Sequence, residues 1–398
     1  MEWNTTKYDE NKIDLVYMWV NGNDIEHKKS REFWQKKLNI PESESNNVHK
    51  YIDHEELKYS LRSAMKNAPW IRKIFIVTNG QVPKWLDLSK TDKIQIITHE
   101  QIMPQDSLPT FNSCAIEYCI HNISDLSEHF LLANDDCFFY RPITPDFFFE
   151  KDGKPIVRLQ KTKIPKYKIK NYLYNRSIKY SNDLFNKKFD TNYTLIPQHN
   201  IDAYSKSLYK ECINTFPEEF DKVIHSKFRI EGVQRIIFAL HLIKQNKCKL
   251  KYINRHKFYK HEDSLYIEIS GCSMLKKIFR NSPYIICIND SCRVKDINLD
   301  NYKTFLQYLF PEKQDYEKDV SGIKINSEMI DVYEKYEEQF NLWWKIKNKT
   351  KYFIIAPLRF LLNSAVEIDK DLFEKDITIL KIIKFKVKRN KHKNEEGI

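Results

Sequence analysis

The chain has 398 residues, 41% of them hydrophobic and 14% aromatic, so it can bury a sizeable core and general disorder is excluded. Only 7 glycines are present, with neither a GxGxxG nor a GxxxxGKS/T motif, so a glycine-rich phosphate loop is not expected. The net charge of +12 is uneven, because residues 151–190 carry a local +9 and residues 375–393 a local +7, leaving about −4 for the rest.

The two basic stretches suit a polyanion or an anionic membrane surface, and a solvated lysine-rich surface explains them equally well. The 8 cysteines include no CxxC pair and no Cys/His zinc spacing, so we expect them to be reduced and mostly buried. The N-terminus is polar and unlike a signal peptide, and no run of 18 apolar residues occurs. These features predict a cytoplasmic protein that is at most attached peripherally to the inner face of a membrane.

Four buried strands are predicted in the first 140 residues, because short apolar runs there end in polar or turn residues. They lie at 13–20, 72–80, 93–100 and 129–135. Helices are expected between them, up to about Leu38, at 53–70 with Asp53 as a possible N-cap, and at 112–123. Strands that alternate with helices predict an α/β fold, with a mostly parallel sheet flanked by helices.

The later chain is less regular. Residues 151–192 are basic and tyrosine-rich and are expected to form an insertion or lid. Helical patterns follow at 199–213, 217–225, 230–246, 298–310 and 327–344, with a fifth strand within 282–292. The predicted division is therefore a nucleotide-sugar-binding half at 1–150, the insertion at 151–192, the second part of a catalytic domain at 193–345, and an amphipathic, basic tail at 346–398.

Polar residues end three of the predicted strands, as Asn21-Gly22, Asn79-Gly80 and Asn134-Asp135-Asp136. Ligands of parallel sheets bind beyond the carboxyl ends of the strands, so these residues predict a site. Asp135 and Asp136 are expected to hold Mg²⁺ or Mn²⁺, because hard cations take carboxylate oxygens and leave positions for a diphosphate. Taken alone, however, an Asp pair is as readily explained by helix capping or a turn.

The surroundings of this pair resemble the Stealth family, which includes capsular-polysaccharide phosphotransferases and the lysosomal-enzyme N-acetylglucosamine-1-phosphotransferase. The resemblance rests on four blocks in order, at about 13–148, 195–245 (partial) and 284–292, the first range holding two of them. They include "IDLVYMWVNGND", "EELKYSLRSAMKNAPWIRKIFIVTNGQVPKWLD", "FLLANDDCFFYRPITPDFFF", "PQHNIDAYSKSLYKEC" and "ICINDSC". The resemblance implies a nucleotide-sugar-transferase-like core (Rossmann-like or GT-A-like) with helical additions. It also implies transfer of a sugar 1-phosphate from a nucleotide diphosphate sugar to a hydroxyl.

The family's catalytic residues fall on Glu117, Asp136, His199 and Arg229. By this resemblance Asp136, with Asp135, would hold the metal, and Arg229 would clamp the transferring phosphoryl group. His199 could act as acid, base or phosphorylated nucleophile, and Glu117 as base or as a residue that orients the histidine. Without the resemblance, these would be a core or capping histidine, a surface arginine and a solvated helical glutamate.

A wider set is expected to contact substrate: Asp14, Asn21, Asp24, Arg62, Asn79, Asn134, Lys206 and Asn289. The chain departs from the common bacterial pattern after His199, where Asn200-Ile201-Asp202 stands, and after Arg229, where Glu231 could replace an acidic residue expected near Gly232. These departures concern recognition of the acceptor more than the class of reaction.

The expected partners are a nucleotide sugar donor, for which UDP-N-acetylglucosamine is the family's commonest association, and a glycan acceptor. A conventional metal-dependent glycosyltransferase is the first alternative. A basic nucleic-acid-binding protein is the second, and the absence of an RNP, helix-turn-helix or zinc signature argues against it. The tail at 375–398 mixes apolar residues with lysines, which fits either peripheral contact with an anionic membrane or a packed terminal element.

Overall fold

The computed structural model describes residues 8–41, 51–161, 163–253, 263–268, 273–289, 299–319 and 326–335, with positions 337, 338 and 341. Residues 1–335 form one compact unit and 336–398 a second, and every element named below belongs to the first. The tail predicted at 346–398 and the loop at 42–50 lie outside the described residues. None of the described helices is long and apolar enough to cross a bilayer.

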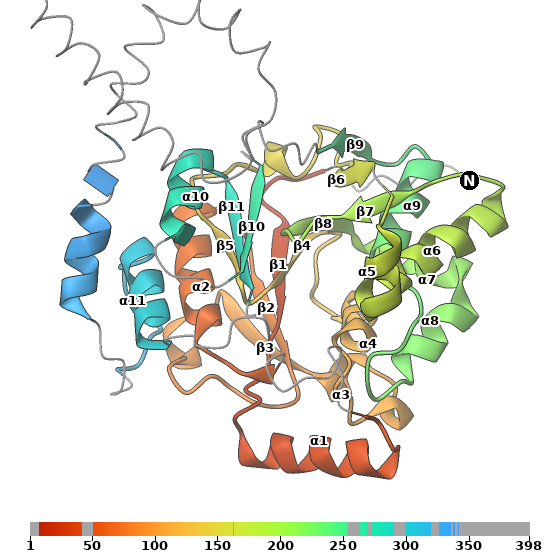
Figure 1. Cartoon of the computed structure of the whole chain (residues 1–398), viewed down its shortest axis with the longest axis horizontal. Helices are drawn as coiled ribbons and strands as arrows, with labels where there is room; N and C mark the ends of the chain where they lie inside the picture. The colour runs from red at the N-terminus through yellow and green to blue at the C-terminus, as the bar shows by residue number, and fades with distance from the viewer. Residues whose placement is uncertain are drawn as a thin grey trace, which may run out of the picture. The chain divides into compact units, whose positions relative to one another are not determined.

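A five-stranded sheet forms the centre of this unit (Figure 1). Its strands are β1 (Ile13–Met18), β2 (Ile74–Thr78), β3 (Ile94–Thr98), β4 (His129–Asn134) and β8 (Asp202–Ser205). The spatial order is β3-β2-β1-β4-β8, with the first four strands parallel and β8 antiparallel to β4. The four strands predicted in the first 140 residues and the mostly parallel α/β fold are therefore confirmed.

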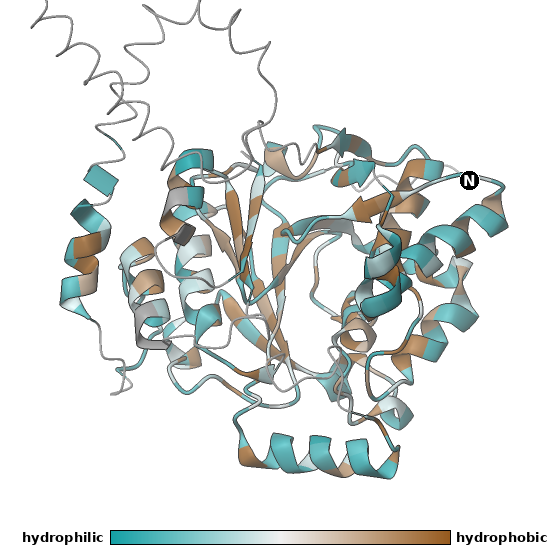
Figure 2. Cartoon of the chain, in the orientation of Figure 1, coloured by the Kyte–Doolittle hydropathy of each residue, from teal (hydrophilic) through white to brown (hydrophobic). Residues whose placement is uncertain are grey.

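Both faces of this sheet are buried, which explains why its strands are continuous apolar runs. Successive side chains point to opposite faces, so Val16 and Leu132 belong to one core while Leu15 and Leu131 belong to the other. Figure 2 shows apolar residues along the central strands and polar ones on outlying helices such as α1. The loops at the strand ends are the remaining places where a ligand can approach.

Helices flank the sheet, and most begin or end within a few residues of their predicted bounds. They are α1 (Ile25–Lys37), α2 (Glu56–Asn67), α3 (His99–Ile102), α4 (Ser113–Glu117), α8 (Pro217–Ile224), α9 (Ile236–Lys244), α10 (Ser273–Asn281) and α11 (Leu299–Leu309). Short 3₁₀ helices lie at Leu88–Lys90, Gln105–Ser107, Ile120–Asn122 and Pro145–Phe147. The helix expected at 112–123 is thus two pieces, and the one expected at 230–246 begins later.

The cap of α2 differs from the prediction. Glu55, in a left-handed conformation with φ 66°, is its N-cap, and no side chain caps the helix. The Asp53 carboxylate instead accepts a hydrogen bond from the Glu55 backbone N–H at 2.9 Å. Asp53 is thereby held just outside the helix.

Two three-stranded sheets complete the unit. One has the order β10-β11-β5, from β10 (Ser264–Glu268), β11 (Ile285–Asn289) and β5 (Cys137–Phe139); the other has the order β7-β6-β9, from β7 (Leu195–Pro197), β6 (Ile156–Lys161) and β9 (Lys249–Tyr252). The strand predicted within 282–292 is confirmed as β11. The predicted insertion contains β6 and then α5 (Lys166–Asn171) and α6 (Leu173–Phe189).

The helix predicted at 199–213 is wrong at its start. Residues 202–205 form β8, and α7 (Lys206–Thr215) begins only afterwards. The reason is that β4 has an open edge, to which Leu132 and Asp202 pair in antiparallel fashion. Hydrogen bonds to that edge override the helical pattern of the local sequence.

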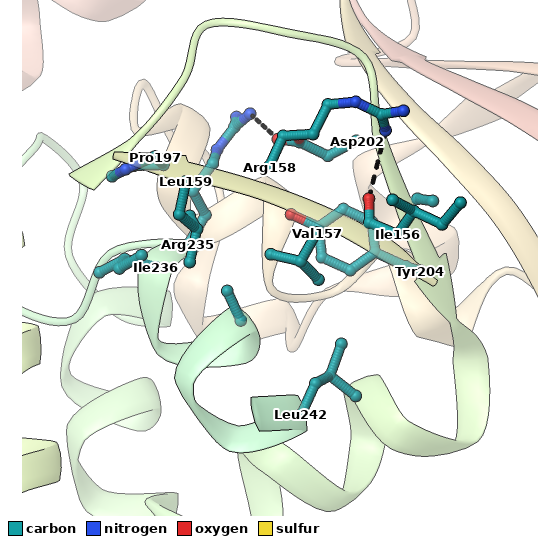
Figure 3. Close-up of a pocket in the computed structure, with 12 residues that line it drawn as sticks. Ile156, Val157, Arg158, Leu159, Pro197, Asp202, Tyr204, Arg235, Ile236 and Leu242 are labelled. Atoms are coloured by element: carbon teal, nitrogen blue, oxygen red, sulfur yellow. Dashed lines mark hydrogen bonds and ion pairs between the residues drawn. The ribbon is translucent and has the colours of Figure 1, made fainter. Parts of the chain in front are cut away.

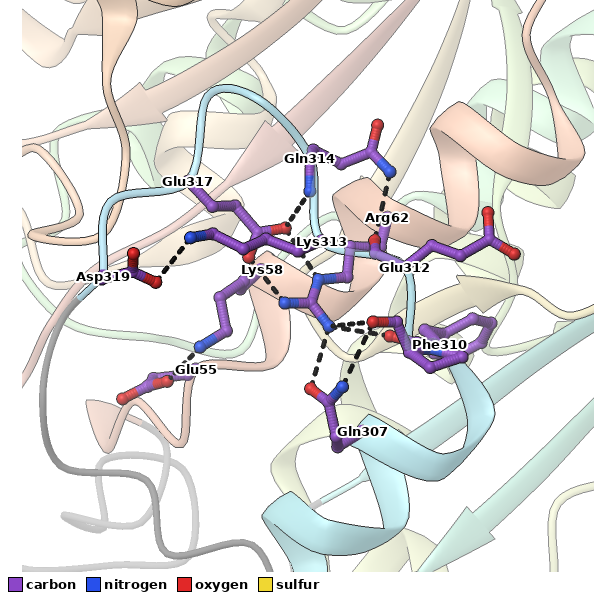
Figure 4. A network of polar contacts seen from close by, with 11 residues as sticks. Glu55, Lys58, Arg62, Gln307, Phe310, Glu312, Lys313, Gln314, Glu317 and Asp319 are labelled. Atoms are coloured by element: carbon purple, nitrogen blue, oxygen red, sulfur yellow. Dashed lines mark hydrogen bonds and ion pairs between the residues drawn. The ribbon is translucent and has the colours of Figure 1, made fainter.

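Arg62, predicted to contact substrate, instead ties α2 to a segment near the end of the unit (Figure 4). Its Nε and one terminal nitrogen donate to the two carboxylate oxygens of Glu317, each at 2.7 Å. The other terminal nitrogen donates to Gln307 and to the Phe310 carbonyl, each at 2.9 Å. Because these partners occupy the buried guanidinium, Arg62 is a structural residue.

Glu317→Ala should lower the free energy of unfolding by about 3–5 kcal/mol, because it leaves the Arg62 charge buried without a partner. Glu312→Ala, in the same segment, is the matched control, because Glu312 pairs with Lys66 at the exposed surface of α2. We expect it to cost about 1 kcal/mol or less in a urea titration. Equal losses for the two variants would contradict the structural role of Arg62.

Candidate active site

The site lies where the order in which the chain adds strands to the sheet reverses. The chain runs from β1 outward to β2 and β3 and then returns to β4 on the other side of β1, so β1 and β4 are neighbours. Such a switch point opens a crevice beyond the carboxyl ends of the two strands. Asn134 pairs with Met18 at this edge, and Asp135 and Asp136 follow it directly. The Asp pair therefore stands where α/β proteins bind their ligands.

The predicted convergence of the strand-end asparagines is present. Asn21 follows β1 and Asn79 follows β2. Gln81 joins the two loops, since its side chain accepts from the Asn21 N–H at 2.8 Å and donates to the Asn21 carbonyl at 3.2 Å. The buried side-chain oxygen of Asn79 has no hydrogen-bond partner among the described residues, which leaves an acceptor at this edge.

Negative charge collects at the end of β4. Burial, together with the nearby charges of Asp136 and Asp53, raises the pKa of Asp135 to about 8, and burial also raises the pKa of Asp136. Neither aspartate forms an ion pair with a lysine or arginine in the part of the chain that the structure covers. Like charges in such a place favour protonation or a bound cation.

Asp136 is held by strands β5 and β11. The Asn289 amide donates to its carboxylate at 3.1 Å, and the thiols of Cys287 and Cys137 lie 3.5 and 3.6 Å from it. Ile288 N–H also donates to the Asp136 carbonyl at 2.9 Å. The pairing of β11 with β5 thus places Asn289, predicted to contact substrate, directly on the second aspartate.

The chemistry of these side chains suits a hard cation better than a soft one. Asp136, Cys137 and Cys287 bring ligand atoms within 4.8 Å of one another. Hydrogen bonding with Cys137 and burial hold the pKa of Cys287 well above its usual value, which raises the cost of forming the thiolate that a metal would bind. Carboxylate oxygens of Asp135 and Asp136 remain, and these are the ligands that Mg²⁺ and Mn²⁺ prefer.

Two further carboxylates belong to this cluster and were missed in the sequence. Burial and the charges of Asp135 and Asp53 hold the pKa of Glu56 well above its usual value, and burial raises that of Asp53. Tyr302 of α11 is 2% exposed, and Glu56, Asp136 and Asp135 also act on the pKa of its hydroxyl, which burial raises. In the sequence, Asp53 and Glu56 look like ordinary helix-capping residues, so no local signal distinguishes them.

A second cluster surrounds Glu117 at the end of α4. Arg235 donates to Glu117 at 2.9 Å and to Asp202 at 3.4 Å, so one guanidinium joins α4, β8 and the start of α9. Glu117 is 2% exposed, and its other carboxylate oxygen is buried without a hydrogen-bond partner in the described chain. Arg235 and Asp202 were not expected as site residues, because their pairing depends on the fold.

Figure 3 shows Arg235 pointing to Asp202 at the rim of a small pocket between β6, β8 and α9. The pocket has a volume of about 30 Å³, which suits one or two water molecules. A nucleotide sugar is far larger, so this pocket is not the donor site. The ion pair of Arg235 and Asp202 forms part of its lining.

Arg229 also reaches α4. Its guanidinium donates to the Ser113 hydroxyl at 2.6 Å, and Ser113 and Glu117 are the two ends of this short helix. No described carboxylate forms an ion pair with Arg229, whereas Arg235 has two. The positive charge of Arg229 is therefore available for an anionic ligand.

His199 lies between two tyrosine rings. Its ring centre is 5.6 Å from that of Tyr174 in α6 and 4.8 Å from that of Tyr266 in β10. The Tyr266 hydroxyl donates to the Asn289 side-chain oxygen at 3.4 Å, and Asn289 in turn donates to Asp136. Contacts thus connect the predicted histidine to the Asp pair, although 63 residues separate them in sequence.

Three residues predicted to contact substrate have contacts within the protein, two of them at the opposite edge of the sheet. Asp14 is fully buried near the start of β1, at the opposite edge of the sheet, where it pairs with Arg72 at 2.7 Å. The Lys206 ammonium donates to the carbonyls of Ile123 and Leu126. Asp24 is the N-cap of α1, accepting from the His27 N–H at 2.9 Å. The structure thus gives each of them a contact within the protein.

Comparison with known proteins finds one matching family model and several similar proteins. Residues 50–157 match conserved region 2 of the Stealth proteins. A capsular polysaccharide phosphotransferase of Actinobacillus suis is 30% identical over 75% of this chain and 81% of its own length. An exopolysaccharide phosphotransferase of Lactiplantibacillus plantarum is 30% identical over 77% of this chain and 96% of its own length.

Other similarities are partial. The capsular polysaccharide phosphotransferase SacB of Neisseria meningitidis serogroup A is 31% identical over 77% of this chain. The match covers only 57% of the length of SacB. Among solved structures, the galactosyltransferase LgtC aligns over 76% of this chain and 98% of its own, at 10% identity and a TM-score of 0.39. That score is too low to support an argument about the site.

The ion pair of Arg235 and Asp202 has a testable pH dependence. Burial raises the pKa of Asp202 to about 6, although Arg235 acts in the opposite direction. The Asp202 carboxyl therefore binds a proton more tightly in the folded state than in the unfolded state. Protonation of Asp202 adds to the free energy of unfolding, fully below about pH 4, and this contribution is lost as the pH rises through about 6. Asp202→Asn should reduce this loss by about 2 kcal/mol.

The measurement is the free energy of unfolding in urea at several pH values between 4 and 7. The exposed Asp190→Asn is the control and should follow the wild-type curve. Parallel curves for wild type and Asp202→Asn would show that Asp202 keeps its ordinary pKa.

Proposed function

The chain belongs to the Stealth family, and we propose that it is a phosphotransferase that moves a sugar 1-phosphate from a nucleotide diphosphate sugar to a glycan hydroxyl. The product would be a phosphodiester-linked capsular or exopolysaccharide, and the nucleoside monophosphate would leave. The observation that carries this proposal is the set of contacts linking Asp136 to His199 and Arg229 to the helix of Glu117, around one sheet edge. Each of these four residues was expected from the family resemblance.

The Asp pair is proposed to hold Mg²⁺ or Mn²⁺ against the donor diphosphate. In support, Asp135 and Asp136 are crowded with Asp53 and Glu56 and lack a described basic partner. When bound, the cation would neutralise the diphosphate and stabilise charge on the leaving phosphate. Asn289 orients Asp136 for this task by its hydrogen bond, and Asn79 offers its side-chain oxygen to the donor.

The two arginines are proposed to differ in role. Arg235 is neutralised by Glu117 and Asp202, so it holds the site together. Arg229 is held only through the neutral Ser113 hydroxyl among the described residues, so its charge can stabilise the oxygens of the phosphoryl group in transfer. Glu117 is accordingly a residue that positions Arg235, because one of its oxygens already binds that guanidinium.

His199 is proposed to move the proton between acceptor and leaving group. Of the four family residues, it alone is a histidine, the side-chain type that can both take up and release a proton near neutral pH. Tyr174 and Tyr266 on either side fix the plane of its ring. Proton transfer by a positioned histidine accelerates a reaction by about a hundredfold or more.

A conventional glycosyltransferase is the second candidate, because the sheet and the Asp pair would serve it equally well. The two differ in the bond that breaks: phosphoryl transfer releases a nucleoside monophosphate, whereas glycosyl transfer releases a nucleoside diphosphate. The full-length protein should therefore be incubated with a panel of nucleotide sugars and Mg²⁺, with UDP-N-acetylglucosamine as the first donor. Phosphorus NMR then identifies the released nucleotide, and a phosphodiester resonance in the product supports the proposal.

Asp136→Asn should abolish transfer while leaving the melting temperature unchanged or higher, because it removes one of two crowded negative charges. EDTA should abolish the transfer by wild type, and added Mg²⁺ or Mn²⁺ should restore it. Asp92→Asn, at an exposed position, controls for the substitution itself. Full activity in EDTA would refute the proposed metal site.

His199→Ala should lower kcat by about a hundredfold or more without a change in the melting temperature. The control is His225→Ala, because His225 is a surface histidine paired with Asp106 and Asp221. Both rates are measured per folded molecule from nucleotide release. A variant that unfolds but keeps its specific activity would make His199 a packing residue.

A further inference from the structure

Five lysines of the predicted insertion lie within ten residues of one another, just before the helix that contacts His199, and we refer to them together as a basic surface. They are Lys161, Lys163, Lys166, Lys168 and Lys170, at the end of β6, in the following loop and on α5. All five are exposed, and none forms an ion pair with a carboxylate of the described residues. Some other basic residues of the described insertion are paired, such as Lys179 with Asp183 on α6. We call these five residues the 161–170 lysines.

The 161–170 lysines lie close to His199 through α6. The Tyr172 N–H donates to the Lys168 carbonyl at 3.0 Å, and Tyr174, two residues further, packs against the His199 ring at 5.6 Å. Lys168 and Lys170 thus lie on the short helix that immediately precedes the residue in contact with the ring. Figure 1 shows α5 leading directly into α6.

The same helices also contact the segment that carries both arginines of the site. Arg176 of α6 donates to the Lys170 carbonyl at 3.2 Å and pairs with Glu231 at 2.9 Å. Glu231 lies between Arg229 and Arg235 in sequence. Arg176 thus joins the Lys170 end of the basic surface to the segment that carries Arg229 and Arg235.

The donor does not account for so much charge. One nucleotide sugar carries one diphosphate, for which the Asp pair with its cation and Arg229 already provide. The proposed product, in contrast, carries a phosphodiester in every repeat, and the growing chain is also the acceptor of the next repeat. Lysines are mobile point charges that attract phosphates without demanding one geometry, which suits a polymer that must advance by one repeat after each transfer.

On the basis of the proposed function, we infer that the 161–170 lysines bind the anionic, phosphodiester-linked acceptor and direct its terminal hydroxyl to His199. The occupant is a glycan polyanion, and its affinity should increase with the number of phosphates and fall with salt. A neutral acceptor would not use this surface. The lysines are binding residues and take no part in the chemical step.

The test compares a triple variant, Lys166→Ala with Lys168→Ala and Lys170→Ala, with a control, Lys187→Ala with Lys188→Ala. Lys187 and Lys188 are also exposed and lie near the end of α6, about 20 Å along the helix from its first residue. Binding is measured in EDTA, so that no turnover occurs, by fluorescence anisotropy of labelled poly(glycerol phosphate). The triple variant should bind about tenfold more weakly and show a shallower salt dependence, while the control matches wild type.

A kinetic measurement uses acceptors of increasing length made from the product of the wild-type protein. The triple variant should raise KM for long acceptors by about tenfold while leaving the donor KM and the KM for a neutral, single-sugar acceptor unchanged. Unaltered binding of poly(glycerol phosphate), or equal losses in the control, would overturn the inference. Loss of binding only to phosphatidylglycerol vesicles would also overturn it and assign the lysines to a membrane surface.

The two proposals fail separately. If the protein released a nucleoside diphosphate, the phosphotransferase proposal would fall, whereas the anisotropy measurement would still report whether this surface binds a phosphodiester polymer. If it released a nucleoside monophosphate and the triple variant bound the polymer like wild type, only the acceptor surface would be wrong.

Discussion

The guanidinium of Arg235 is the contact on which one half of the site depends. It lies between Glu117 and Asp202 and so joins α4, β8 and α9, although Glu117 and Arg235 are 118 residues apart in sequence. Removing a charge from water is costly, and here two carboxylates offset the cost for one arginine. Since Arg229 bonds to Ser113 at the other end of α4, the position of the second arginine depends on the same short helix.

The crevice divides its charges between two sides. The aspartates after β4 are grouped with Asp53 and Glu56 at the start of α2, while Arg229 has no described carboxylate partner and the lysines around α5 are exposed. A reaction that brings a diphosphate and a second anion together needs both, because two anions repel each other in water. The negative side suits a bound cation, and the positive side acts on phosphates directly.

The sequence was informative wherever a local pattern determines the structure. Buried strands such as β1 and β11 are apolar runs with no alternative use, and the Asn134-Asp135-Asp136 end could be predicted because parallel strands present their carboxyl ends together. Local patterns were less informative where contacts with a distant segment determine the structure. β8 is a strand because it pairs with the edge of β4.

The same reason explains why some predicted site residues have structural partners and why some carboxylates of the site were missed. Asp14 and Arg62 are polar residues within the sequence blocks that resemble the family. Only the fold shows that Asp14 pairs with Arg72 and Arg62 with Glu317. Asp53 and Glu56 look like helix caps until the fold brings Asp135 beside them. The sequence around a carboxylate does not show which charged groups the fold will place beside it.

The contact between Arg62 and Glu317 also bears on the order in which the protein is made. Glu317 leaves the ribosome 255 residues after Arg62, which at about 5–20 residues per second is a delay of some 10–50 s. Until then α2 carries a cation whose native partner has not been synthesised, and the strands that supply Tyr266 and Asn289 are also late. The nascent N-terminal half therefore lacks residues that orient Asp136 and His199, so the site matures only near the end of translation of this unit.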